Sequence, residues 1–351
     1  MHVFVVPDLE GPVTGGTLFN RRVVASLQAQ QADCVVSSKA TADEQLSRVG
    51  PEDVFWIDSL FLDLLPELAR APRRRAPLGL LVHYLPSLVT RGESVSRSEL
   101  TLAEREALAS ADLIMVPSRY MAMVVQRLMG ALAPILVIEP GRLAVGAAKP
   151  PGAPPCAVMV ANLLPGKGVL PFLEQLAAQV RSGDEYQLNI VGGFALDPQY
   201  AGECRRAAED SRLQERVRML GECSPEATLA HMSCCNLFVS ASTMESYGMA
   251  LGEARGLGLP ILAVRGGNVE LLVDAGAGGE VVSDVTALVE AFVAVCRAPV
   301  ELRRRLDAAQ ANVLAPRPWA QVAGEYLDKM EAVRAARQAE QTCRSRDVEP
   351  A

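Results

Sequence analysis

Hydrophobic and polar positions follow one pattern that runs through the chain twice. Short apolar runs rich in β-branched residues, such as HVFVV at 2–6 and LIMV at 113–116, alternate with longer segments that have helical periodicity. Because the short runs are apolar on both faces, they predict buried strands of parallel sheets covered by helices. The predicted strands lie at 2–6, 34–37, 54–57, 79–82, 113–116 and 135–138 in the first half, and at 156–161, 187–191, 217–220, 236–240 and 260–264 in the second.

A proline-rich stretch separates the two halves. Residues 144–156 contain four prolines, and proline fixes φ and donates no backbone hydrogen bond, so this stretch predicts a linker. A chain of 351 residues is also longer than a single core usually supports. We therefore predict two Rossmann-like domains that face each other across a cleft. The predicted parts are a domain at 1–143, the linker at 144–156, a domain at 157–316, a long amphipathic helix at 317–341 and a tail at 342–351.

Composition and charge narrow the function classes. Half of the residues are hydrophobic and the net charge is −7, which fits a globular protein and argues against a general nucleic-acid binder. The start MHVFVVPDLEGP predicts a first strand rather than a signal peptide, and no apolar run reaches the roughly 20 residues of a membrane helix. The eight cysteines are scattered without metal-ligand spacing, so we expect free thiols, no metal site and a cytoplasmic location. The adjacent pair Cys234–Cys235 is either redox-active or, as we prefer, simply packed.

Ligands of open α/β sheets bind at the carboxyl ends of the strands, so the loops there are the candidate site. Gly15-Gly16 follows the first strand and is either a plain turn or a close approach of the backbone to an anion. His83 follows the fourth strand and is either packed or aimed at a ligand. Lys167 follows the first strand of the second domain on a glycine-flanked loop, where it is either solvated or neutralises a phosphate. No dinucleotide or P-loop fingerprint is present.

Two carboxylates stand eight residues apart in FVSASTMESYGMALGEARGLGLPILAV, at Glu245 and Glu253. Glu245 leaves a buried strand, and the residues Tyr247, Gly248 and Met249 begin a helix whose first amides are unpaired. Glu253 emerges two turns later on nearly the same face as the helix start. A carboxylate there can accept two hydrogen bonds from a ribose diol, while Glu245 can bind sugar hydroxyls and the amides a diphosphate. One element could therefore hold all three parts of a nucleotide sugar.

These residues resemble a known family, the GT-B glycosyltransferases of family 4, which are retaining enzymes that use nucleotide-sugar donors. The resemblance runs in order from residue 1 to about 315, and the helix at 317–341 resembles the one that crosses back to the N-terminal domain. It rests on the E-x7-E element at 245–253 with its aromatic–glycine pair, the Gly15-Gly16 loop, His83, ADLIMVPSRY at 111–120, and ANLLPGKG at 161–168, which aligns with the family's G-R-L-x3-K-G loop.

The resemblance implies a role for each matching residue. Glu253 would bind the donor ribose, Glu245 would bind the transferred sugar, and the amides of residues 247–249 would contact sugar or phosphate. Lys167 would neutralise the diphosphate leaving group, and His83 would contact the sugar near the reacting carbon. It also implies a metal-independent site without a cofactor, since the chain has no D-x-D motif. In the family's proposed scheme, the leaving phosphate itself takes the proton of the acceptor.

One residue departs from the family pattern. Asn162 stands where the family carries an arginine that also binds the donor, after Ala161 in place of a glycine, while Gly16 would close over the diphosphate from the other domain. Loss of one cation weakens leaving-group stabilisation, and Arg142 is a candidate substitute. The leading hypothesis is therefore a hexosyltransferase, and the alternative is a catalytically impaired sugar-nucleotide-binding subunit or regulatory partner. An epimerase of the same fold has no support beyond the fold.

The substrates beyond the donor class are open at this point. UDP-sugar is the default donor because it is the family's commonest. The acceptor is a small molecule, a glycan or a lipid-linked compound, which we expect the N-terminal domain to bind. Three consecutive arginines at 73–75 are either a solvated loop or a weak peripheral membrane contact. The oligomeric state is also open.

Overall fold

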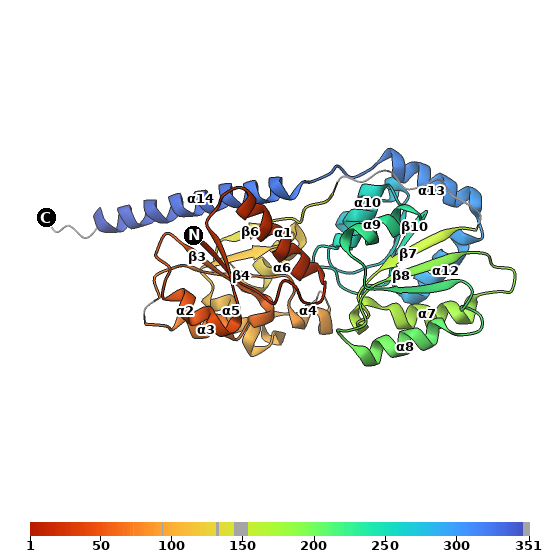
Figure 1. The fold of residues 1–351 in the computed structure, drawn as a ribbon, viewed down its shortest axis with the longest axis horizontal. Helices are drawn as coiled ribbons and strands as arrows, with labels where there is room; N and C mark the ends of the chain where they lie inside the picture. The colour runs from red at the N-terminus through yellow and green to blue at the C-terminus, as the bar shows by residue number, and fades with distance from the viewer. Residues whose placement is uncertain (73, 93, 131–132, 144–153, 347–351) are drawn as a thin grey trace.

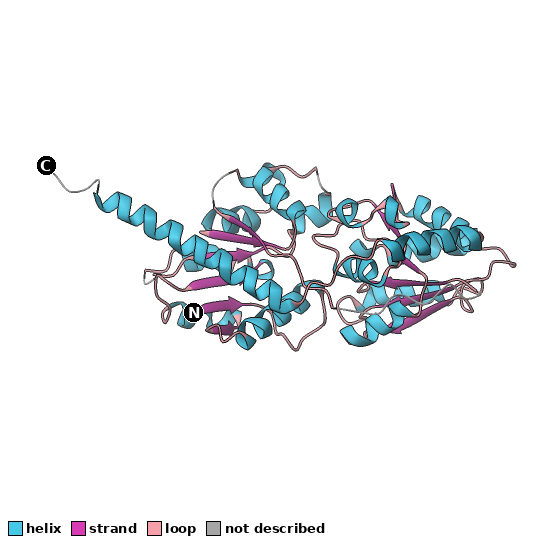
Figure 2. Cartoon of the chain, turned by 90° about the horizontal axis from the view of Figure 1, so that it is seen from above, coloured by secondary structure: helices cyan, strands magenta, loops and turns pink. Residues whose placement is uncertain are grey.

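Two parallel six-stranded sheets, each covered by helices, form the two lobes of the molecule (Figures 1 and 2). The structure is a computed structural model that describes residues 1–72, 74–92, 94–130, 133–143 and 154–346. This arrangement is the GT-B fold, which confirms the predicted fold class.

The N-terminal sheet has the order β2-β1-β3-β4-β5-β6, and its strands are parallel with β1 in register with both β2 and β3. The residues of β1, β3, β4 and β5 are all buried, as expected for strands covered on both faces. The strands are β1 (His2–Val5), β2 (Cys34–Ser37), β3 (Val54–Asp58), β4 (Leu78–Leu81), β5 (Leu113–Val116) and β6 (Ile135–Val137). The helices are α1 (Gly15–Ala29), α2 (Ala42–Leu46), α3 (Leu64–Ala69), α4 (Pro86–Arg91), α5 (Leu102–Ser110) and α6 (Arg119–Met129).

The C-terminal sheet has the order β12-β11-β10-β7-β8-β9 and is also parallel. Its strands are β7 (Cys156–Val160), β8 (Gln187–Val191), β9 (Val217–Gly221), β10 (Leu237–Ser240), β11 (Ile261–Val264) and β12 (Glu280–Val282). Its helices are α7 (Val169–Gln179), α8 (Pro198–Ala208), α9 (Pro225–Ser233), α10 (Met249–Leu257), α11 (Val269–Leu272), α12 (Val285–Cys296) and α13 (Pro299–Ala311).

The last helix, α14 (Trp319–Arg346), returns to the N-terminal lobe and runs along it, as expected (Figure 1). Tyr326 anchors it, because its ring is fully buried in the N-terminal core and its hydroxyl accepts a 2.8 Å hydrogen bond from Trp56 Nε1. The same hydroxyl lies 2.7 Å from His2 Nδ1. The N-terminal domain is thus completed by the C-terminal end of the chain.

Each predicted strand corresponds to an observed one, and the sequence patterns missed only β12 among the described strands. Most of the predicted linker, residues 144–153, and the end of the predicted tail, residues 347–351, lie outside the described residues. Within the described part of the chain, no helix is long and apolar enough to cross a bilayer. The cytoplasmic location and the domain boundaries stay predictions.

Candidate active site

Two adjoining cavities lie between the carboxyl ends of the two sheets. The smaller, of about 250 Å³, is lined mainly by the C-terminal domain, and the larger, of about 540 Å³, is lined by both domains. They share one wall, made by Thr14, Gly15, Leu164, Lys167, Glu245, Gly248 and Met249. The two carboxylates and the loops predicted from the sequence therefore meet in one place.

The loop that carries Glu245 is held from behind by residues 266–268. The backbone amide of Asn268 donates a 2.7 Å hydrogen bond to the carbonyl of Glu245, and its buried side chain donates one of 2.7 Å to the carbonyl of Tyr247. A side chain at Gly267, where φ is +65°, would place its Cβ 2.1 Å from the same Glu245 carbonyl. The loop geometry thus depends on a backbone contact that only glycine allows.

Helix α10 begins at the shared wall of the cavities. Gly248 precedes it with φ of +85°, and no side chain caps its first turn, so the first amides stay available to a ligand. Tyr247 points away from these amides into the protein, where its buried hydroxyl accepts a 2.7 Å hydrogen bond from Arg142. The helix start is therefore a ready anion-binding end whose orientation is fixed on both sides.

Glu253 lines the smaller cavity on the same helix. Burial raises the pKa of its carboxyl to about 7, and within the described residues no hydrogen bond or ion pair to this carboxylate is recorded. The side chain is half-buried, and a largely desolvated carboxyl without a partner is costly unless a ligand supplies hydrogen-bond donors. This carboxylate is therefore the clearest sign of a ligand site in the molecule.

Lys167 and Glu245 form an ion pair at the shared wall of the cavities. Lys167 Nζ lies 2.6 Å from Glu245 Oε1 and 3.5 Å from Ser242 Oγ. The lysine is placed by Gly168, whose φ is +66° and whose position would bring a Cβ within 2.2 Å of the Ala241 carbonyl. Among the described residues that line the two cavities, Lys167 is the only lysine or arginine.

Asn162 joins the two domains. Its side-chain amide donates a 2.8 Å hydrogen bond to the carbonyl of Val13, and its Oδ1 accepts one of 3.0 Å from Gly193. The amide of Val13 donates in turn to Glu222 Oε1 at 3.3 Å. Two side chains of the C-terminal domain therefore hold the backbone N–H and C=O of Val13, in the loop that leads to Gly15.

His83 is buried in a polar cluster at the edge of the larger cavity. Its Nε2 lies 2.8 Å from Asn20 Oδ1 and 3.5 Å from Asp58 Oδ2, and Asn20 donates a 2.7 Å hydrogen bond to the same Asp58 oxygen. Burial lowers the pKa of His83, and the Asp58 carboxylate only partly opposes this. The imidazole packs under Gly16, where a Cβ would lie 3.1 Å from its Cδ2.

The structure brings the predicted site residues together, but the proposed substitute cation does not lie among them. Gly15, Gly16, His83, Asn162, Lys167, Glu245, Tyr247, Gly248, Met249 and Glu253 all line one or both cavities. Arg142, the candidate substitute cation, lines neither cavity, since it binds Tyr247 and the carbonyl of Ala315. Sequence reasoning missed Asp58, although it directly follows the predicted strand 54–57, and it missed Asn20, Glu222 and Asn268, for which no local pattern exists.

Metal-binding side chains do not cluster here. No group of three or more His, Cys, Asp or Glu residues within the described ranges could hold a metal ion.

Comparisons with known proteins point to one family for the second half of the chain. Residues 146–313 match the model of the family "Glycosyl transferases group 1". No curated protein matches the chain significantly.

Solved structures share the fold over nearly the full chain. A sucrose-phosphate synthase from Thermosynechococcus elongatus has a TM-score of 0.77 and 18% identity, with coverage of 95% of this chain and 99% of that one. HepE of Anabaena, solved with UDP and glucose, has a TM-score of 0.70 and 16% identity, with coverage of 94% and 99%. A glycosyltransferase from Rickettsia africae has a TM-score of 0.67 and 14% identity, with coverage of 95% and 98%. At these identities the likeness shows the GT-B fold.

Proposed function

We propose that this protein is a retaining glycosyltransferase that moves a hexose from a nucleoside-diphosphate sugar, by default a UDP-sugar, to an acceptor hydroxyl. The observation that carries the proposal is the half-buried Glu253 carboxylate, which has no hydrogen-bond partner among the described residues and lies on α10. The uncapped start of this helix shares one cavity wall with Lys167 and Glu245. A ribose diol, a diphosphate and a sugar are the groups that these three features recognise. HepE, which shares the fold, was solved with UDP and glucose.

The donor would lie along α10. Its ribose diol donates to Glu253 in the smaller cavity, its diphosphate meets the amides of residues 248–250 and Lys167, and its sugar extends into the larger cavity. The smaller cavity is closed by the Val13 peptide, which Asn162 and Glu222 hold.

Donor entry would exchange the partner of Lys167. Its ammonium lies 2.6 Å from Glu245 Oε1, which neutralises it. A diphosphate carries more charge than one carboxylate and draws the ammonium toward itself. Glu245 then becomes free to accept hydrogen bonds from the sugar, so one exchange prepares both the leaving group and the sugar contact.

The transfer step needs no protein nucleophile in this scheme. The bond from the anomeric carbon to the leaving phosphate oxygen breaks, a bond to the acceptor oxygen forms on the same face, and the acceptor proton passes to that phosphate oxygen. Lys167 and the helix amides stabilise the developing charge, which is why we propose that no metal ion and no other cofactor is required. His83 stays neutral near pH 7 because its pKa is lowered, so it would offer a neutral hydrogen-bonding group to the sugar rather than a second cation.

Product stereochemistry tests the proposal. The enzyme is incubated with UDP-glucose, or with another nucleotide sugar that raises its melting temperature, and the anomeric proton of the product is followed by NMR. We expect the α-configuration of the donor to be kept, in buffer with or without EDTA. A β-configured product would overturn retention. Binding of donor without any turnover would support the binding-subunit alternative instead.

A further inference from the structure

We propose that the acceptor is a small amphiphilic alcohol, in which one hydroxyl is carried on an apolar body, rather than a glycan. This inference rests on the proposed function, because it assigns to the acceptor the part of the larger cavity that the transferred sugar leaves free. The cavity adjoins the donor site through Lys167 and Glu245, so an alcohol bound there would point its hydroxyl at the transferred sugar.

The walls of the larger cavity are apolar and come from both domains. Its size of about 540 Å³ lies in the range that holds one small molecule. The apolar side chains that line it include Leu60, Tyr84, Leu88, Val89, Leu196 and Met244.

Large apolar side chains are left exposed at this cavity. Leu60, Val89 and Leu196 are 51%, 43% and 38% exposed, and they are three of the ten most exposed large apolar residues within the described part of the chain. They come from the turn after β3, from α4 and from the loop after β8. Since single exposed leucines are ordinary but a convergent set lining a cavity is not, these side chains indicate an apolar ligand.

The polar groups of the cavity are largely occupied by one another. Asp58 accepts hydrogen bonds from the amide of Leu60 at 2.9 Å and from Asn20 at 2.7 Å. The Thr17 hydroxyl lies 3.1 Å from the carbonyl of Pro12, to which it donates. A glycan would bring many hydroxyls into this space, and each buried one without a partner is costly. A body with few hydroxyls fits instead.

One polar group of the cavity, the Tyr84 hydroxyl, remains available to a hydroxyl of the ligand. The Tyr84 hydroxyl has no recorded hydrogen-bond partner within the described ranges, and burial raises its pKa, so it stays a neutral donor. An aromatic ring with one free hydroxyl suits a ligand that is mostly apolar with one polar end.

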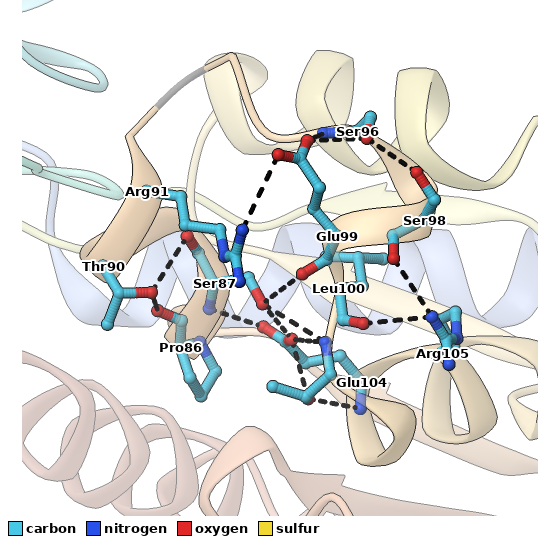
Figure 3. A network of polar contacts seen from close by, with 11 residues as sticks. Pro86, Ser87, Thr90, Arg91, Ser96, Ser98, Glu99, Leu100, Glu104 and Arg105 are labelled. Atoms are coloured by element: carbon cyan, nitrogen blue, oxygen red, sulfur yellow. Dashed lines mark hydrogen bonds and ion pairs between the residues drawn. The ribbon is translucent and has the colours of Figure 1, made fainter.

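A network of hydrogen bonds holds α4, which forms one wall of the cavity, against α5 (Figure 3). Glu104 of α5 is fully buried, and it accepts hydrogen bonds from the amide of Ser87 at 2.8 Å and from its hydroxyl at 2.5 Å. The same carboxylate accepts from the amide and hydroxyl of Thr101 at 2.7 and 2.8 Å. Because Ser87 opens α4, this network fixes the helix that presents Leu88 and Val89 to the cavity.

Calorimetry of the full-length protein with a series of n-alkanols, from butanol to decanol, tests the inference in the presence of saturating UDP. We expect saturable binding whose Kd falls about fourfold for each added methylene until the chain fills the cavity. Under the same conditions, maltose should show no saturable binding. Leu60→Glu should weaken decanol binding at least about tenfold, because it places a charge beside the apolar chain.

The controls separate the inference from the proposed function. Leu102→Glu changes an exposed leucine of the same domain that lines neither cavity, and it should bind decanol as the wild type does. Leu196→Glu repeats the test from the other domain in case Leu60→Glu is unstable. If UDP binds but alkanols do not, or if Leu102→Glu loses as much as Leu60→Glu, the apolar acceptor is refuted while the donor site stands. If UDP itself does not bind, the proposed function and the acceptor role fail together.

Discussion

Glu253 gives the sharpest quantitative prediction, because its ionisation should control nucleotide binding. Burial raises the pKa of its carboxyl from 4.5 to about 7. The ionised form is the better acceptor for both hydroxyls of a ribose diol. Only about one tenth of the carboxyl is ionised at pH 6, against about nine tenths at pH 8. We therefore expect UDP to bind about tenfold more weakly at pH 6 than at pH 8.

Calorimetry in buffers with different ionisation enthalpies measures this directly. The diol favours the ionised carboxylate, so UDP binding near pH 6.5 should release a fraction of a proton from the protein. Glu253→Gln should bind UDP more weakly at pH 8 and lose this proton release. A 2′,3′-dideoxy analogue of UDP, which has no diol, should show no difference between wild type and Glu253→Gln. Because this analogue carries the same phosphates as UDP, it also serves as the control for the pH dependence that comes from phosphate ionisation.

Ionisation of the same carboxyl should strengthen UDP binding but lower the folding stability of the protein. Because its folded pKa is raised, Glu253 destabilises the protein as pH rises from about 4.5 to about 7. The full cost corresponds to at most about 3 kcal/mol, less what partial contact with solvent recovers. Glu253→Gln should therefore gain stability over wild type at pH 8 and gain none at pH 4. The account of Glu253 is wrong if the variant keeps the wild-type pH dependence in both binding and unfolding.

Three further outcomes follow from the site. Lys167→Ala should lower kcat/KM, because the variant loses about 2–4 kcal/mol of transition-state stabilisation; a wild-type kcat/KM would refute the phosphate role of Lys167. Asn162→Arg should tighten UDP binding by about 1–2 kcal/mol at low salt, since a charged phosphate contact outweighs the lost hydrogen bond to Val13, and the gain should shrink as salt rises. Glu104→Ala should lower the free energy of unfolding by about 3–5 kcal/mol, whereas Glu106→Ala on the same helix should cost under about 1 kcal/mol in urea titrations. Burial opposes ionisation of Glu104, but hydrogen bonds from Ser87 and Thr101 lower its pKa, so its contribution should persist above pH 4.5 and be lost as pH falls below it.

The fold was predictable because most strands that pair into the two sheets are also marked by a strong local sequence pattern. Strands such as LIMV at 113–116 are buried on both faces, so their composition alone marks them. The strand β12 was missed because it has only three residues, half-buried at the sheet edge after a glycine-rich turn. Its position depends on pairing with β11, which no local pattern encodes.

The residues that line the candidate site were predictable because each follows a predicted strand or begins a predicted helix. Glu253 lies on the helix whose start follows Glu245, so a common site for the two carboxylates follows from their short separation along the chain. The pairing of Lys167 with Glu245 joins residues 78 positions apart, and the link from Asn162 to Val13 joins residues 149 positions apart. Such contacts depend on how the two domains close, and sequence patterns carry no information about that closure.

Turnover of nucleotide sugars tests the central claim most directly. Wild type and Lys167→Ala are incubated with UDP-glucose and a panel of other nucleotide sugars, with and without EDTA, and release of the nucleoside diphosphate is followed over time with an apolar alcohol present. The account predicts release from at least one donor by the wild type, unchanged by EDTA and lowered at least about thirtyfold by Lys167→Ala. Tight binding of nucleoside diphosphate without release from any donor, or equal rates in both proteins, would contradict it.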